Sequence, residues 1–209
     1  MFRRVGIGNP KIIACVALAL IAVLAVFLLE QEIGGHPSYG GSQIESELQK
    51  VPRGYYSTNK FPNYGGSSSG LNSFLTSGFR LPSNYQTGVF DCSESAAYVE
   101  WALEDAGFTA SIATSSYCPW GSGGHAWVTV RTTNGYTVAI EPTALTGYSL
   151  WDRIKHFFTG RVEGIVYSGD QYQYYYYSPE HQFSNIYDVI EYYGSAGEWD
   201  WWLGSWGFI

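Results

Sequence analysis

The distribution of apolar residues divides the chain into three parts. Residues 1–33 contain an uninterrupted run of 18 residues without a charge, Ile12 to Leu29, which at about 1.5 Å per residue can cross most of the hydrocarbon core of a bilayer. Residues 34–70 are dominated by Gly, Ser, Tyr, Asn and Pro, a composition typical of a tether. We therefore expect one compact domain over residues 71–209.

The first part favours an uncleaved membrane anchor over a signal peptide. Signal peptides have apolar regions of about 7–15 residues before a small-x-small cleavage site, and the sequence Val-Phe-Leu-Leu-Glu at the end of this run offers no such site. Three basic residues precede the run and two glutamates follow it, so the positive-inside bias keeps the N-terminus cytoplasmic. This predicts a single-pass protein of the cell membrane with an extracellular C-terminal domain.

The spacing of apolar and polar residues after residue 71 predicts an α+β fold. A helix is best marked between Phe90 and Gly107, because Asp91 and Glu94 have the spacing of a capping box and Gly107 stands where a helix stops. Three strands are expected next, at 108–114, 125–131 and 136–141. A helix followed by neighbouring antiparallel strands gives the α+β order.

The remaining elements are marked more sparsely. Ser149 could cap a helix through Phe158, and Ser178-Pro179-Glu180 could open another that Gly194 closes. The tyrosine run 174–177 favours a strand, and a short helix over 43–50 fits within the tether. Four of the eight Trp residues lie in the last eleven positions, where they pack on the domain, line a cleft or rest at the membrane interface.

The charge balance argues against nucleic acid as a partner. All 18 acidic residues lie at or after Glu30, so residues 30–209 carry 18 acids against 8 bases, whereas phosphate binding needs a basic face. Phosphate-binding loops and dinucleotide fingerprints are also missing from the sequence.

One cysteine occupies a position that suits a nucleophile. If Asp91 is the N-cap, Cys92 is the first residue of its helix, where free backbone N–H groups and the positive end of the helix dipole favour a thiolate. Cys15 lies inside the apolar run and is most simply a small hydrophobic residue there.

A thiol nucleophile needs a base and a group that orients the base. His125 opens one predicted strand and Glu141 ends the next, so their meeting depends on the hairpin register. A two-residue loop at 134–135 turns Glu141 away from His125. A three-residue loop at 133–135, with a left-handed Gly135, places Glu141 diagonal to His125 on the same face, and we prefer it.

The segments that contain these three residues resemble those of a known superfamily. The segments DCSESAAYVEWALEDAGF, GGHAWVTV and AIEPT, within about residues 90–143, resemble the nucleophile helix, histidine strand and acid strand of the transglutaminase-like superfamily of papain-type thiol enzymes. The third residue of this family is usually Asp, and here it is Glu141. The resemblance implies a papain-like core in which a nucleophile helix packs on an antiparallel sheet.

The resemblance also implies an activity. Cys92 would attack a carboxamide or peptide carbonyl, His125 would transfer the proton, and Glu141 would orient the imidazole. Hydrolysis follows if water resolves the thioester, and transamidation follows if an amine does. Gln86 stands where papain-like enzymes place an oxyanion-hole glutamine. The expected substrate is a peptide or cell-surface polymer, with no metal or organic cofactor, and the oligomeric state stays open.

Other interpretations remain at this point. Cys92 could form a disulfide with Cys118, since disulfides persist outside the cell. The two cysteines could also hold a metal with His125 and Glu141, although the close ligand pairs of most zinc sites are missing. The main functional alternative is a catalytically inactive, cell-surface binding module on the same fold.

Overall fold

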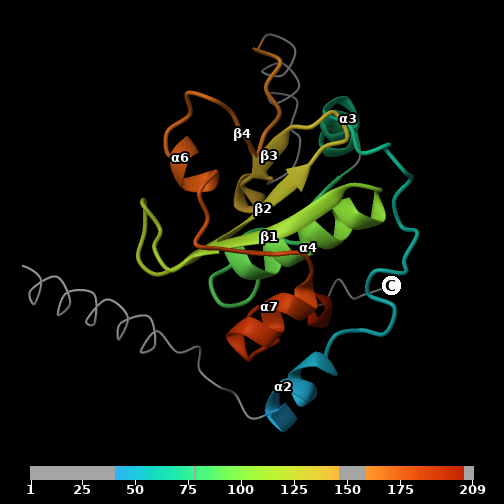
Figure 1. Cartoon of the computed structure of the whole chain (residues 1–209), viewed down its shortest axis with the longest axis vertical. Coiled ribbons are helices and arrows are strands. Elements are labelled where there is room, and N and C mark those ends of the chain that lie inside the picture. Colours follow the sequence, from blue (N-terminus) through green and yellow to red (C-terminus); the bar gives the residue numbers. More distant parts are fainter. Residues whose placement is uncertain (1–40, 78, 146–158, 205–209) are drawn as a thin grey trace, which may run out of the picture. The chain divides into compact units, whose positions relative to one another are not determined.

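The computed structural model describes residues 41–77, 79–145 and 159–204. These residues form an α+β unit built on a five-stranded antiparallel sheet, which confirms the predicted fold class (Figure 1). The strands are β1 (Thr109–Ser115), β2 (His125–Arg131), β3 (Thr137–Ile140), β4 (Ile165–Val166) and β5 (His181–Phe183), in the spatial order β4-β3-β2-β1-β5. The helices are α2 (Gly41–Leu48), α3 (Ser68–Ser77), α4 (Cys92–Asp105), α6 (Gln173–Tyr176) and α7 (Ile186–Tyr193), and two short 3-10 turns are η1 (Pro142–Ala144) and η2 (Trp201–Leu203).

Helix α4 forms as its sequence predicts and covers one face of the sheet (Figure 1). The Asp91 side chain accepts a hydrogen bond from Ser93 N, and Glu94 Oε2 accepts one from Asp91 N, so the capping box is complete. Gly107 follows the helix with φ +85°, in the left-handed region that only glycine adopts at little cost. Both ends of the helix are therefore fixed by local sequence.

The opposite face of the sheet carries a second, smaller cluster. Ala113, Trp127 and Ala139 pack there against Tyr176 of α6. The run at 174–177 is a helical turn rather than the predicted strand. In a strand, neighbouring side chains point to opposite faces, whereas the turn lets Tyr175 and Tyr176 both pack on this cluster.

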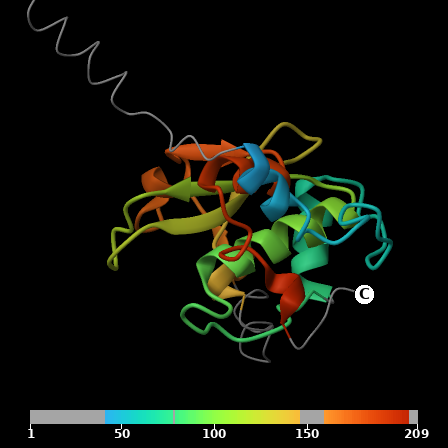
Figure 2. The same cartoon turned by 90° about the horizontal axis from the view of Figure 1, so that it is seen from below.

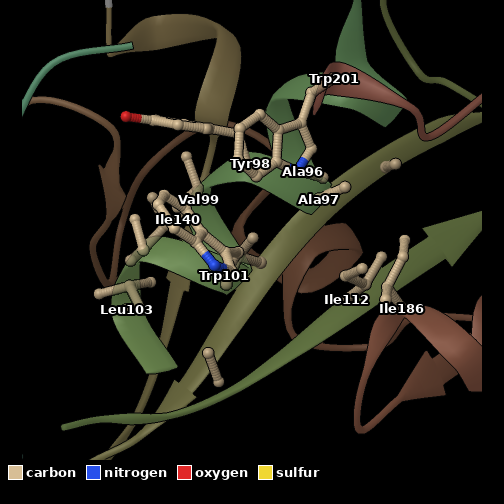
Figure 3. Packing of buried hydrophobic residues seen from close by; sticks show 14 of the residues in the cluster. Ala96, Ala97, Tyr98, Val99, Trp101, Leu103, Ile112, Ile140, Ile186 and Trp201 are labelled. Carbon is tan, nitrogen blue, oxygen red and sulfur yellow. The ribbon is translucent and has the colours of Figure 1, made fainter. Parts of the chain in front are cut away.

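The tether prediction for residues 34–70 is wrong from residue 41 onward. Tyr55 is fully buried and accepts hydrogen bonds from two core tryptophans, through its carbonyl from Trp101 and through its hydroxyl from Trp201. Figure 3 shows Trp101 and Trp201 packed with Tyr98. The glycines and serines suggested loose chain, but aromatic side chains among them bury enough apolar surface to join the core. The domain therefore starts before residue 71.

The C-terminal part differs from prediction at one helix start. Residues 181–183 form β5 on the edge of β1, and α7 begins after them with Asn185 as N-cap. Gly194 ends the helix with φ +70°, as predicted. Helix α7 lies against α2 in both views (Figure 2).

The aromatic tail of the described chain belongs mostly to the core. Trp199, Trp201 and Trp202 are buried, which agrees with packing on the domain. The predicted helix at 149–158 and the apolar run at 12–29 lie outside the described residues. Within residues 41–77, 79–145 and 159–204, no helix has the length and hydrophobicity to span a bilayer.

Candidate active site

The β2–β3 hairpin has the three-residue loop expected from its sequence. Arg131 pairs with Thr137, and Thr132 N donates to Tyr136 O at 2.8 Å, so residues 133–135 form the loop. Gly135 has φ +88°, the left-handed conformation that this loop requires. The register therefore places His125 and Glu141 on one face, as predicted.

His125 joins Cys92 and Glu141 at one end of the sheet. Its Nε2 lies 2.7 Å from Oε2 of Glu141, and its side chain also hydrogen-bonds to Cys92. His125 is buried, whereas Cys92 is partly exposed at the first position of α4. The residue predicted as the base thus contacts both the predicted nucleophile and the predicted orienting group.

A glycine allows the close approach of the strand that carries His125. A Cβ on Gly124 would lie 2.8 Å from the carbonyl oxygen of Ser115, and Ser115 is the residue of β1 that pairs with His125. Because the obstructing atom belongs to the backbone, any side chain at position 124 displaces the histidine or the strand beside it.

Glu141 is surrounded by hydrogen-bond donors. Thr143 donates to Oε1 through both its backbone N–H and its hydroxyl. The Tyr176 hydroxyl donates to Oε2 at 2.6 Å, the same oxygen that faces His125. Such donors stabilise the ionised form of a carboxylate and fix its orientation.

The charges of the three groups depend on one another. Burial disfavours the charge on His125, but its hydrogen bonds to Cys92 and Glu141 and the negative charges of these groups prevail and raise the pKa of His125 from 6.5 to about 10. Burial also disfavours the charge on Glu141, yet His125, Thr143 and Tyr176 hold the pKa of this carboxyl below its usual 4.5. The imidazole that carries this raised pKa is the one that hydrogen-bonds to Cys92.

Aromatic rings hold the imidazole from two sides. The His125 ring is nearly parallel to that of Trp127, with centroids 5.9 Å apart, and the Trp120 ring meets it edge-on at 5.1 Å. Trp127 Nε1 donates to the carbonyl of Tyr176, which ties α6 to the sheet behind the site. The ring positions therefore restrict rotation of the imidazole.

A cleft of about 590 Å³ opens beside Cys92 and His125, within the size range of small-ligand sites. Its walls come from the start of α4, the adjoining ends of β1 and β2, and the chain around β5 and the end of α7. The lining residues are Gly88, Asp91, Cys92, Ser93, Glu94, Thr114, Ser115, Ser116, Gly124, His125, Ala126, Glu180, His181, Tyr192, Tyr193, Gly197, Glu198 and Trp199.

Gln86 is not brought to this cleft. Its backbone pairs with Phe90 in a tight turn before α4, with Gln86 N donating to Phe90 O at 2.9 Å, and its side chain is exposed. Gly88 of the same turn lines the cleft, but Gln86 is not among its lining residues. The oxyanion role expected for Gln86 stays a prediction.

The alternatives based on Cys118 lack support among the described residues. Cys92 and Cys118 are both free thiols, and Cys118 is buried. The described part of the chain also contains no group of three or more His, Cys, Asp or Glu that could hold a metal ion.

Tyr176 and Thr143 are site residues that the sequence did not indicate. Thr143 stands two residues after Glu141, a spacing at which a carboxylate can accept a hydrogen bond from the backbone N–H, as in an Asx turn. Tyr176 lies 35 positions from Glu141, and nothing local marks it among four consecutive tyrosines. Its role depends on the placement of α6, which only the fold defines.

Comparison with known proteins gives little functional information. The chain matches no family model and no solved structure. It is 33% identical over 102 residues to the uncharacterized protein MJ0834 of Methanocaldococcus jannaschii, a match that covers 47% of this chain and 42% of that protein. The chain thus matches less than half the length of this relative.

Proposed function

We propose that this protein is a membrane-anchored, extracellular thiol enzyme that hydrolyses or exchanges amide bonds in peptides or cell-surface polymers. The observation that carries the proposal is the contact of His125 with both Cys92 and Glu141. A nucleophile, a base and a group that orients the base are the set that covalent acyl transfer needs.

The fold proposed with this function is a transglutaminase-like variant of the papain architecture. The order of the nucleophile helix α4, the histidine strand β2 and the acid strand β3 supports it. The glutamate in place of the usual aspartate is accommodated because Glu141 reaches His125 diagonally across the hairpin.

In the first step, the Cys92 thiolate attacks the carbonyl carbon of the substrate amide. A C–S bond forms, and the π electron pair moves onto the carbonyl oxygen. When the tetrahedral intermediate collapses, the C–N bond breaks and the imidazolium of His125 gives its proton to the leaving amine. The product of this step is a thioester on Cys92 beside a neutral imidazole.

In the second step, His125 takes a proton from water or from an acceptor amine as this group attacks the thioester. The C–S bond then breaks, and the Cys92 thiolate and the His125 imidazolium are restored. Water gives hydrolysis, and an amine gives transamidation.

The first turn of α4 offers a donor for the developing oxyanion. Cys92 is at the N1 position, and no residue in the described part of the chain accepts a hydrogen bond from its backbone N–H. The positive end of the helix dipole acts in the same direction.

The proposed location follows from the N-terminal sequence. The uncharged run at 12–29, with basic residues before it and glutamates after it, supports a single-pass anchor that leaves the catalytic domain outside the cell. Peptides and surface polymers are the amide substrates found there.

The proposal is tested by alkylating the full-length protein with iodoacetamide in detergent at pH 7. We expect Cys92 to react at least about 10-fold faster than Cys118, because a thiolate beside an imidazolium is the reactive form. The His125→Ala variant should lose this difference. Incubation with a peptide library, with and without an added primary amine, then identifies hydrolysis and transamidation products by mass spectrometry.

Two variants serve as controls. Cys92→Ala should abolish turnover, whereas Cys118→Ser should retain it, since Cys118 has no place in the proposed mechanism. Equally slow alkylation of both cysteines, with no products from the library, would overturn the enzymatic proposal and favour the binding module.

A further inference from the structure

The cleft beside Cys92 has an unbalanced charge. Four of the residues that line it are acidic, none of the described lining residues is Lys or Arg, and the raised pKa of His125 makes its imidazole a positive group there. Asp91 and Glu94 are engaged in the capping box of α4. Glu180 and Glu198 lie on the other wall, near β5 and after α7, and both are exposed.

These two glutamates differ in their partners. Glu180 accepts hydrogen bonds from the backbone N–H and the hydroxyl of Ser116, which lower the pKa of its carboxyl and hold it at the mouth of the cleft. Glu198 has no hydrogen bond or ion pair with any residue in the described part of the chain. Glu198 is therefore the carboxylate that remains available to a ligand.

The aromatic residues between them are held in fixed positions. The Tyr193 hydroxyl donates to Thr114 Oγ1 at 2.8 Å, and the Tyr192 hydroxyl lies 2.8 Å from His181 Nε2. The negative charges of Glu180 and Glu198 both act on Tyr193, so the two carboxylates lie within electrostatic reach of this ring. Ring faces beside carboxylates attract cations through both the ring quadrupole and the negative charge.

One buried donor on the same wall lacks an acceptor. Trp199 lines the cleft with 2% of its surface exposed, and its indole N–H has no hydrogen-bond partner in the described part of the chain. The Nε1 atom is itself buried, so the N–H is closed off from the cleft in this conformation. Trp199 therefore contributes its ring to this wall.

We propose that the wall formed by Glu180, Tyr193, Glu198 and Trp199 recognises a positively charged side chain, ammonium or guanidinium, of a peptide substrate. This inference rests on the proposed function, because it assigns the substrate class of the same cleft. The charged group is recognised and does not react. A guanidinium group should therefore be recognised as well as an ammonium group. This distinguishes the recognised side chain from an acceptor amine, which has to attack the thioester.

The test uses the full-length protein and peptides of equal length in which one position at a time is Lys, Arg, norleucine or Glu. We expect Lys and Arg to exceed norleucine in kcat/KM by about 10-fold at one position. Glu198→Gln should reduce this preference about threefold, and Glu198→Lys should abolish it. The matched control is Glu191→Gln, an exposed glutamate of α7 that does not line the cleft.

The same peptides, labelled with a fluorophore, are bound to the Cys92→Ala variant and followed by anisotropy. This measurement needs no chemistry, so it reports charge recognition even if the catalytic proposal fails. Equal values for Lys and norleucine in both measurements would overturn the inference. A preference for Lys and Arg that survives both Glu198 substitutions would overturn it as well, since the charge would then be recognised elsewhere.

Discussion

Replacing Glu141 by glutamine probes the electrostatic centre of the proposed site. The substitution keeps the size of the side chain and removes its charge. The described contacts of Glu141 with Thr143 and Tyr176 all come from donors, and a protonated His125 adds another. The amide of glutamine has one oxygen that accepts and one NH₂ group that donates. In either orientation its NH₂ group therefore faces at least one of these donors.

The magnitude follows from the pKa of His125. The rise from 6.5 to about 10 corresponds to about 5 kcal/mol in favour of the protonated ring, at about 1.4 kcal/mol per unit. Cys92 and Glu141 together raise the pKa of His125, and they do so against burial, which lowers it. We expect the loss of Glu141 to lower the pKa of His125 by about 2 units, or about 3 kcal/mol.

The assay is the dependence of kcat/KM on pH between 5 and 11. In the wild type, we expect activity to fall as the His125 imidazolium loses its proton near pH 10, because the leaving amine then receives no proton. In Glu141→Gln this alkaline limb should move to about pH 8, and the maximal kcat/KM should fall about 100-fold. NMR titration of the His125 ring checks the shift directly. An alkaline limb that stays within half a unit of the wild type would refute the assigned role of Glu141.

Three further predictions follow from the same contacts. In Tyr176→Phe, the ring keeps its packing on Trp127 but the Glu141 carboxylate loses a hydrogen-bond donor. The kcat/KM should therefore fall about 10-fold, and the acidic limb of its pH dependence should move to higher pH. An acidic limb that does not move would contradict this role of Tyr176. Gly124→Ala should lose most activity while keeping its circular dichroism spectrum, because the added Cβ would collide with the backbone of Ser115. Full activity would show that the backbone shifts to make room without displacing His125. His125 has a folded-state pKa above its unfolded value, so its contribution to stability is complete below pH 6.5 and disappears as the pH rises through about 10. Urea denaturation at pH 7 and 10.5 should therefore show a larger loss for the wild type than for Glu141→Gln, and equal losses would contradict the assignment.

The parts of the fold that local sequence encodes were predictable. The capping box of α4 needs only residues 91–94, and the β2–β3 register follows from three loop residues ending in Gly135. Because that register decides whether His125 and Glu141 share a face, the contact between them could be derived before any coordinates.

Features that depend on tertiary contacts were not predictable. Residues 181–183 form a strand because the edge of β1 supplies their hydrogen bonds, and the sequence window shows only a plausible start of a helix. Tyr176 reaches Glu141 because α6 packs on the sheet. Residues 41–70 have the composition of flexible chain, yet a few aromatic side chains anchor them.

The burial of Tyr55 has a practical consequence for recombinant work. A shortened protein that starts at residue 71 would omit Tyr55, and the indoles of Trp101 and Trp201 would lose the hydrogen bonds that they donate to it. It would also leave an apolar cavity beside helix α4, a defect that promotes aggregation. Soluble versions for crystallisation or enzymology should therefore begin at or before residue 41, where the described unit starts.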